Sequence, residues 1–161
     1  MLDFISGFQS AVIGTLDENG FPFSSYAPFV YDDHRYYVFI SDIAGHARNL
    51  RRDKRASLFF IEDEVAAANI FARRRVSLQC ETAIVSRNGA RFDIVMAKFK
   101  TKFGADMIGM LMQMQDFNLH EFRAVGGEAT FGFGEAYTLG GEHMETLRPR
   151  RGGAGALRPV A

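Results

Sequence analysis

The sequence has no tryptophan, a single cysteine, few prolines and no excess of charge of either sign. Lys and Arg number 19, as do Asp and Glu, so the chain lacks the basic surplus that general binding to nucleic acid requires. Cys80 has no second cysteine with which to form an internal disulfide. No apolar run reaches the roughly 20 residues that cross a bilayer, and the N-terminus lacks the features of a secretion signal. We therefore expect a cytoplasmic protein that binds neither membranes nor nucleic acid.

Several motifs that carry chemistry are also missing. The chain has no Gly-rich dinucleotide fingerprint, no P-loop, no paired CxxC and no HExxH. Its four histidines, His34, His46, His120 and His143, are too far apart to indicate a zinc site by spacing. Cys80 lies among apolar residues of an expected strand and is typical of a small core residue rather than a nucleophile. We therefore expect a bound cofactor to supply chemistry that the side chains lack.

Hydrophobic residues make up 47% of the 161, which is ample for one packed core rich in the 16 phenylalanines. Alternation and turn signals predict most elements. The expected elements are a short helix at 2–8, strands from residue 10 around Asn19-Gly20 and at 35–40, a polar helix from Ser41, strands at 56–61 and 73–85, an amphipathic helix from Asn88-Gly89 to Phe103, a methionine-rich helix at 107–114, and a closing hairpin of 117–125 and 128–139 around Gly126-Gly127.

The order of these elements lacks strict strand–helix–strand alternation. It predicts an α+β protein with a mainly antiparallel sheet, and about six strands in so short a chain favour a small barrel. We expect the barrel domain to cover residues 1–139. The segment 140–161 has too little apolar content to fold by itself, so we expect a flexible C-terminal tail.

The stretch from Ser41 to Asp63 contains the most informative polar residues. Ser41 is an expected helix cap, and Ile43, Ala44, Ala47 and Leu50 recur at helical spacing as one apolar face. His46, Arg48 and Asn49 occupy the other face near the helix start, where free backbone N–H groups favour an anion. The pattern fits a site for a phosphate or a propionate, and it equally fits a solvated surface helix.

Five segments, in order, resemble a known family. They are GFPFSSYAPFVY, SDIAGHARNLRRDKRASLFFIEDE, NIFARRRVSLQCETA, DFNLHEF and GFGEAY, and they lie within residues 10–137. Together they resemble the FMN-binding split β-barrels related to pyridoxamine phosphate oxidase, and most of all the haem-utilisation, haem-degrading branch. The resemblance implies a split β-barrel with flanking helices, and a homodimer with two equivalent pockets at the subunit interface.

In the flavin-binding members a basic residue near the position of Ser25 and a lysine near His46 hold the FMN phosphate. Serine carries no charge, and a histidine of ordinary pKa is only partly cationic at neutral pH. Ser24, Ser41, Asn49 and Arg75 remain as hydrogen-bond donors. The pattern therefore favours haem over FMN as the cofactor, with FMN as the alternative.

In the haem-degrading branch an arginine that matches Arg75 lies on the distal side of the haem, where a permanently protonated donor is useful. The resemblance also implies that Asp116 accepts a hydrogen bond from the histidine that ligates the iron. That ligand comes from a glycine-rich tail, and the comparable segment here, RRGGAGALRPVA, contains no histidine. His143, further upstream, is the candidate substitute as metal ligand.

The leading hypothesis is thus a dimeric protein of haem-iron utilisation that binds a small planar cofactor or substrate and opens the porphyrin oxidatively. Arg75 and Asp116 are its expected catalytic residues. Two alternatives stay open. One is an FMN-dependent oxidoreductase related to pyridoxamine phosphate oxidase, and the other is a haem or flavin carrier without catalytic activity.

Overall fold

The computed structural model describes residues 1–150. The helices are α1 (Leu2–Ser6), α2 (Gly45–Arg52), α3 (Ala90–Phe103) and α4 (Ala105–Gln113), with two short 3-10 turns, η1 (Glu64–Ala66) and η2 (Ile70–Ala72). The strands are β1 (Ser10–Leu16), β2 (Pro22–Asp32), β3 (Arg35–Ser41), β4 (Arg55–Ile61), β5 (Arg75–Val85), β6 (Phe117–Thr130), β7 (Ala136–Gly140) and β8 (Thr146–Pro149).

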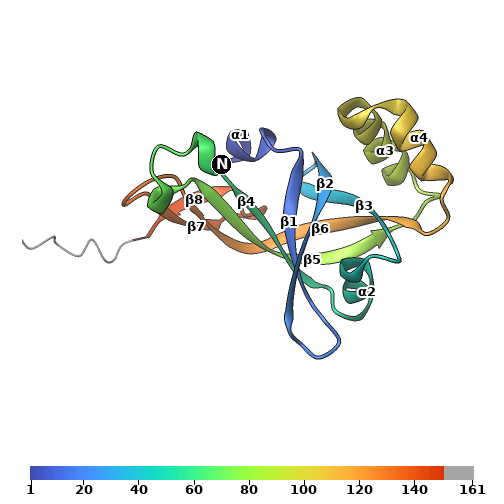
Figure 1. Ribbon diagram of the computed structural model, residues 1–161, viewed down its shortest axis with the longest axis horizontal. Helices are drawn as coiled ribbons and strands as arrows, with labels where there is room; N and C mark the ends of the chain where they lie inside the picture. The colour runs from blue at the N-terminus through green and yellow to red at the C-terminus, as the bar shows by residue number, and fades with distance from the viewer. Residues whose placement is uncertain (151–161) are drawn as a thin grey trace, which may run out of the picture.

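All eight strands form one antiparallel sheet in the order β3-β2-β1-β4-β5-β6-β7-β8, and β3 also pairs with β6. This last pairing closes β1 to β6 into a six-stranded barrel, and β7 and β8 extend the sheet from β6. The long strands β5 and β6 run along most of the molecule (Figure 1). The α+β split β-barrel expected from the sequence is confirmed.

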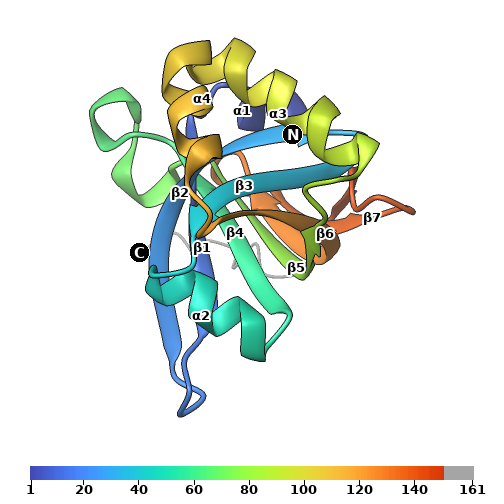
Figure 2. The same cartoon turned by 90° about the vertical axis from the view of Figure 1, so that its right-hand side faces the viewer.

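The protein has two hydrophobic clusters. The first fills the barrel with alternate side chains of β1 to β6, together with Ile5, Ala47 and Leu50 from the helices. The second lies between the α3–α4 pair and the outside of β3 and β6, where Tyr37, Phe39 and Leu119 meet the apolar side of α3. Figure 2 shows α3 and α4 on one side of β3 and α2 on the other. Cys80 is buried in the first cluster, as expected.

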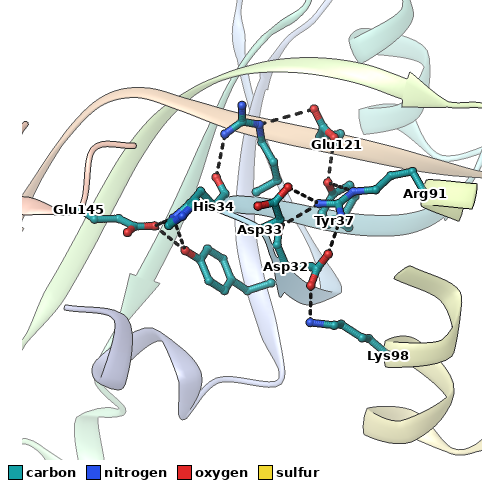
Figure 3. Close-up of polar contacts among 10 residues, drawn as sticks. Asp32, Asp33, His34, Tyr37, Arg91, Lys98, Glu121 and Glu145 are labelled. Carbon is teal, nitrogen blue, oxygen red and sulfur yellow. Dashed lines mark hydrogen bonds and ion pairs between the residues drawn. The ribbon is translucent and has the colours of Figure 1, made fainter. Parts of the chain in front are cut away.

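The β2–β3 hairpin turns at Asp33 and His34, whose φ angles of 48° and 59° are both positive. Two such residues form the primed turn that matches the twist of a hairpin, and Asp is among the residues that tolerate this conformation. Polar contacts then fix α3 to this hairpin (Figure 3). Arg91 lies 2.7 Å from Asp32, and its Nε donates to the Tyr37 hydroxyl at 2.8 Å. Lys98 pairs with the same Asp32 carboxylate, which is therefore the shared anchor of α3.

Replacing this anchor tests the network. We expect Asp32→Asn to lower the free energy of unfolding at pH 7 by about 1–2 kcal/mol, because two cations lose their common carboxylate. The hydrogen bond from Lys98 is the main cause that holds the pKa of Asp32 below its ordinary value. Its contribution is thus complete above the ordinary carboxyl pKa of about 4 and is lost as the pH falls through the lowered folded value.

Urea titrations at pH 7 and pH 3 measure this difference between the wild type and D32N. The control is Asp33→Asn, because Asp33 is 75% exposed and lies 3.6 Å from Arg91. Equal losses in D32N and D33N, or a D32N loss that persists undiminished at pH 3, would contradict the role of Asp32.

Two local expectations were wrong. Gly126-Gly127 does not turn the chain, since β6 continues through it and the turn to β7 lies at residues 131–135. A Cβ on Gly127 would lie 2.5 Å from the Ser77 carbonyl oxygen, so glycine is needed there for close strand packing beside a register shift at Gln79/Cys80. Ser41 does not cap α2, whose N-cap is Ala44.

The described part of the C-terminal segment contains one further strand. The sequence boundary at 139/140 falls at the end of β7, and Thr146–Pro149 form β8 through pairing with β7 rather than through apolar content of their own. The remaining part of the expected tail, 151–161, lies outside the described residues.

Candidate functional site

The polar helix α2 carries its histidine and asparagine inward. His46 Nδ1 lies 2.8 Å from the Ser25 hydroxyl, and Asn49 Nδ2 donates to Thr15 Oγ1 at 2.9 Å. Both residues of α2 are buried, so the expectation of a solvated polar face is wrong for them. The strand hydroxyls compensate their burial, and Arg48 alone of the three stays exposed.

Burial also determines the charge of His46. It lowers the pKa of the imidazole below its ordinary value of about 6.5, so the ring is neutral at pH 7. Its Nε2 atom is buried and has no hydrogen-bond partner among residues 1–150. A neutral ring offers a phosphate dianion much less than the lysine of the flavin-binding relatives would.

Ser41 and Asp116 form a second contact at the end of β6. The Ser41 hydroxyl donates to Asp116 Oδ2 at 2.5 Å, and the Ile43 N–H donates to the Ser41 oxygen at 3.2 Å. The Asp42 N–H donates to the Asp116 carbonyl at 2.8 Å. The carboxylate of Asp116 is therefore oriented by the segment that leads into α2.

Arg75 begins β5, directly opposite Ile61 of β4 and Thr130 of β6. Its Nη1 donates to the Arg73 carbonyl at 3.0 Å. The next two arginines upstream are occupied differently: Arg74 pairs with Glu62 and Arg73 with Glu64. Arg75 forms no ion pair with a carboxylate among residues 1–150, and this leaves its guanidinium for an external anion or acceptor.

Arg75 and Asp116 lie at opposite ends of β6. Arg75 pairs with Thr130 at one end, and Asp116 precedes Phe117 at the other. At about 3.3 Å per residue the two positions are on the order of 40 Å apart along the strand. Figure 1 shows the same separation, with the β6–α4 connection at the far end from the start of β5. One copy of the chain therefore cannot place both side chains on one small ligand.

His143 occupies the turn between β7 and β8. Its ring stacks on His34 with 3.9 Å between the ring centroids and 6° between the planes. His34 Nδ1 in turn lies 2.9 Å from Glu145, which also accepts from the Tyr31 hydroxyl. His143 thus joins the β7–β8 hairpin to the β2–β3 turn. Within residues 1–150 no group of three or more His, Cys, Asp and Glu side chains is placed to hold a metal ion.

The outward face of the sheet carries a groove of about 770 Å³ over β5, β6, β7 and β8. Glycine shapes its floor: a Cβ on Gly126 would lie 2.7 Å from Gln79 Oε1, and one on Gly140 would lie 2.5 Å from Arg148 Nε. A second cavity, of about 500 Å³, extends from the same Gln79 and Val125 toward β1 and β4. Ser24, opposite Gly14, points to this outward face, whereas Ser25 contacts His46.

The predicted residues therefore form separate groups. Ser25 meets His46, Ser41 meets Asp116, and Ser24 and Arg75 lie on the outward face. Sequence reasoning missed Thr15, His120 and Arg148. His120 is buried in β6, and burial is the main cause that lowers its pKa to about 4. The sequence pattern does not mark His120 as buried, since it and its neighbour Leu119 are both buried and so break the alternation. Nothing in the sequence marks Arg148 except its place in a short arginine-rich segment.

A family model described as pyridoxamine 5′-phosphate oxidase matches residues 1–130. The chain belongs to this family, which agrees with its split barrel.

Particular relatives narrow the comparison. Among curated proteins the chain is similar to the heme oxygenase HutZ of Vibrio cholerae serotype O1 strain El Tor Inaba N16961, with 39% identity over 132 residues, 82% of this chain and 74% of the relative. A crystal structure of HutZ, named there as the heme storage protein from Vibrio cholerae, has 36% identity and a TM-score of 0.76, and covers 82% of this chain and 94% of that one. Campylobacter jejuni ChuZ has 29% identity and a TM-score of 0.82, and covers 92% of this chain and 60% of that one.

No helix within residues 1–150 is long and apolar enough to span a bilayer.

Proposed function

We propose that this protein binds haem, serves its utilisation as an iron source, and degrades it oxidatively in a pocket that two copies of the chain complete. The similarity to HutZ supports the choice of haem. The single observation that carries the two-copy pocket is the separation of Arg75 and Asp116 at opposite ends of β6. Two chains related by a two-fold axis bring the Arg75 end of one copy to the Asp116 end of the other.

The outward face of the barrel supports such a homodimer. One row of paired residues crosses it from Tyr26 through Val12 and Phe59 to Ser77. Tyr26 is 69% exposed and Val12 is 40% exposed, which is unusual for large side chains in the middle of a sheet. A second copy that covers this apolar end of the row would leave the glycine-lined groove at its other end open for a ligand.

The groove fits haem by its size and its glycine floor, and Arg75 lies on the same outward face of β5 as the groove residue Ser77. Haem supplies the affinity for oxygen and the electron transfer that side chains lack. Arg75 provides a permanently charged donor beside the guest, able to orient and polarise an oxygen acceptor at hydrogen-bond distance. Asp116, already oriented by Ser41, would accept a hydrogen bond from the imidazole of an iron ligand and so fix that ring.

The neutral, buried His46 disfavours FMN as the resident cofactor, because it brings no positive charge to the phosphate. A spectrum of the protein as isolated distinguishes the two: a flavin absorption pair favours FMN, and its absence favours haem. We further infer a cytoplasmic location, which suits a buried, unpaired Cys80.

Titration of the full-length protein with hemin tests the proposal. We expect a saturable Soret band, and its loss with formation of ring-opened product after ascorbate is added in air. A Soret band that survives ascorbate would show that the protein binds haem without degrading it. The relative HutZ is itself described both as a heme oxygenase and as a heme storage protein. No saturable binding would end the haem proposal altogether.

His143→Ala tests the proposed iron ligand. If His143 ligates the iron after leaving its stack on His34, the variant will bind hemin at least about tenfold more weakly and with a shifted Soret maximum. His34→Ala is the matched control, because it removes the stacking partner and keeps the ligand. A hemin complex of H143A with the wild-type spectrum and affinity would contradict the assignment.

A further inference from the structure

Arg148 lies at the end of a row of paired side chains across the groove. Ser77 of β5 is opposite Glu128 of β6, Glu128 is opposite Thr138 of β7, and Thr138 is opposite Arg148 of β8. Directly paired residues of an antiparallel sheet point to the same face. All four belong to the lining of the 770 Å³ groove, so Arg148 faces the ligand space from the sheet edge.

The charge of Arg148 is uncompensated. It forms no ion pair and no side-chain hydrogen bond with another residue of the described range 1–150. Its neighbour Arg150 is different, because its Nη1 lies 2.7 Å from Glu128 Oε2 and neutralises the one acid of the row. The groove therefore presents one guanidinium without an acidic partner, that of Arg148, and no free carboxylate from this row. Arg75 lies outside the lining, two residues from Ser77 on the same face of β5. Such a site prefers a guest with negative charge.

Glycine fixes where the guanidinium lies. A Cβ on Gly140 would be 2.5 Å from Nε and 2.8 Å from Cζ of Arg148, so the side chain lies flat against the bare backbone at this point. Any larger residue at position 140 would displace it. The φ of Gly140 is not in the positive region, so the absence of a side chain there serves the close approach rather than the turn.

The spacing of the two arginines also fits one planar guest. Three inter-strand distances of about 4.8 Å separate β5 from β8, which places the two backbones on the order of 14 Å apart. A porphyrin is polar at one edge only, where its two propionates project, and its centre lies well away from them. Arg75 at the centre and Arg148 at the carboxylate edge would satisfy both parts of the molecule.

We propose that Arg148 binds a propionate of haem and thereby sets the orientation of the ring in the groove, an assignment that rests on the proposed function above. Arg148 acts through charge and fork geometry, and it takes no part in the chemistry at the iron. The guest it selects is a flat molecule with carboxylates at one edge, and a porphyrin with esterified carboxylates loses this contact.

The test compares hemin with hemin dimethyl ester, in which both carboxylates are masked. Wild-type protein, Arg148→Gln, Gly140→Ala and the control Arg52→Gln are titrated with each compound by Soret absorbance. Arg52 pairs with Glu18, and neither residue lines the groove. We expect R148Q to bind hemin about five- to tenfold more weakly and to bind the ester as the wild type does. G140A should follow R148Q, since it displaces the guanidinium without removing its charge. R52Q should follow the wild type.

A wild-type preference for hemin over the ester that survives in R148Q would overturn the assignment. So would an equal loss in R52Q, which would indicate a general effect of positive charge. If the wild type binds neither compound, the proposed haem function itself fails, and this result is distinct from failure of the Arg148 assignment. Circular dichroism spectra of the variants confirm that each comparison concerns folded protein.

Discussion

Lowering the pH from 7 to 4.5 will reduce the free energy of unfolding by about 2–3 kcal/mol, and most of this loss will disappear in His120→Phe. His120 is 1% exposed near the start of β6, and its Nε2 has no hydrogen-bond partner among residues 1–150. Burial is the largest cause that lowers its pKa to about 4, while Asp42 acts weakly in the opposite direction. The folded protein thus holds this ring neutral at a pH where the unfolded chain would protonate it.

The sign follows from proton binding. Between the unfolded pKa of about 6.5 and the folded pKa of about 4, the unfolded state binds more protons, so stability falls as the pH falls. Above about pH 6.5 neither state is protonated and His120 adds no pH dependence. Burial also lowers the pKa of His46 in α2. We therefore expect His46 to cause the smaller loss of stability at low pH that remains in His120→Phe.

Urea titrations at half-unit steps from pH 7.5 to pH 4.5 measure the effect. Phe replaces the imidazole with a somewhat larger apolar ring, and no hydrogen bond from Nε2 is lost. His120→Leu serves as a second variant in case the larger ring does not fit. A wild-type stability that is flat over this range, or an acid loss of the same size in both variants, would show that His120 is not the sensitive group.

The barrel was predictable because its physics is local. Strands β1, β4 and β5 alternate buried and more exposed side chains, and the turns between the first three strands carry Asn19-Gly20 and Asp33, so period and turn chemistry agree. β3 is buried on both faces, and its aromatic and β-branched residues marked it as a strand. β8 was missed because it is stabilised by pairing with β7, a neighbour that its own four residues do not reveal. Gly126-Gly127 was misread as a turn because the same residue type serves close strand packing, and only the position of Ser77 distinguishes the two.

The site was less predictable than the fold, for a similar reason. His46 and Asn49 were selected as candidates from the sequence, but spacing on α2 could not show that Ser25 and Thr15 reach them from two strands. Arg75 and Asp116 came from family resemblance, and the sequence gives no measure of the distance between them. That distance is set by the unbroken length of β6, which was itself missed through the glycine pair. One local error thus concealed the strongest argument for a second copy.

Mixing two defective chains will restore activity if the pocket is shared between copies. We expect Arg75→Ala and Asp116→Ala each to lose haem degradation at least about tenfold when pure, since each removes a residue from every pocket. In a mixed dimer one pocket carries both changes and the other carries neither. Random assembly of equal amounts makes half of the dimers mixed, so about a quarter of wild-type activity will return.

The experiment uses co-expressed chains with different tags, purified sequentially so that only mixed dimers remain, in which half of the pockets are intact. Loss of the Soret band after ascorbate gives the rate, and the number of high-affinity hemin sites per dimer gives a readout that needs no turnover. Doubly tagged R75A dimers are the control for the effect of the tags. If both residues served one copy's own pocket, each mixed dimer would hold two singly defective sites, and no activity would return. We expect recovery instead, because roughly 40 Å of extended strand cannot bring its two ends onto one porphyrin.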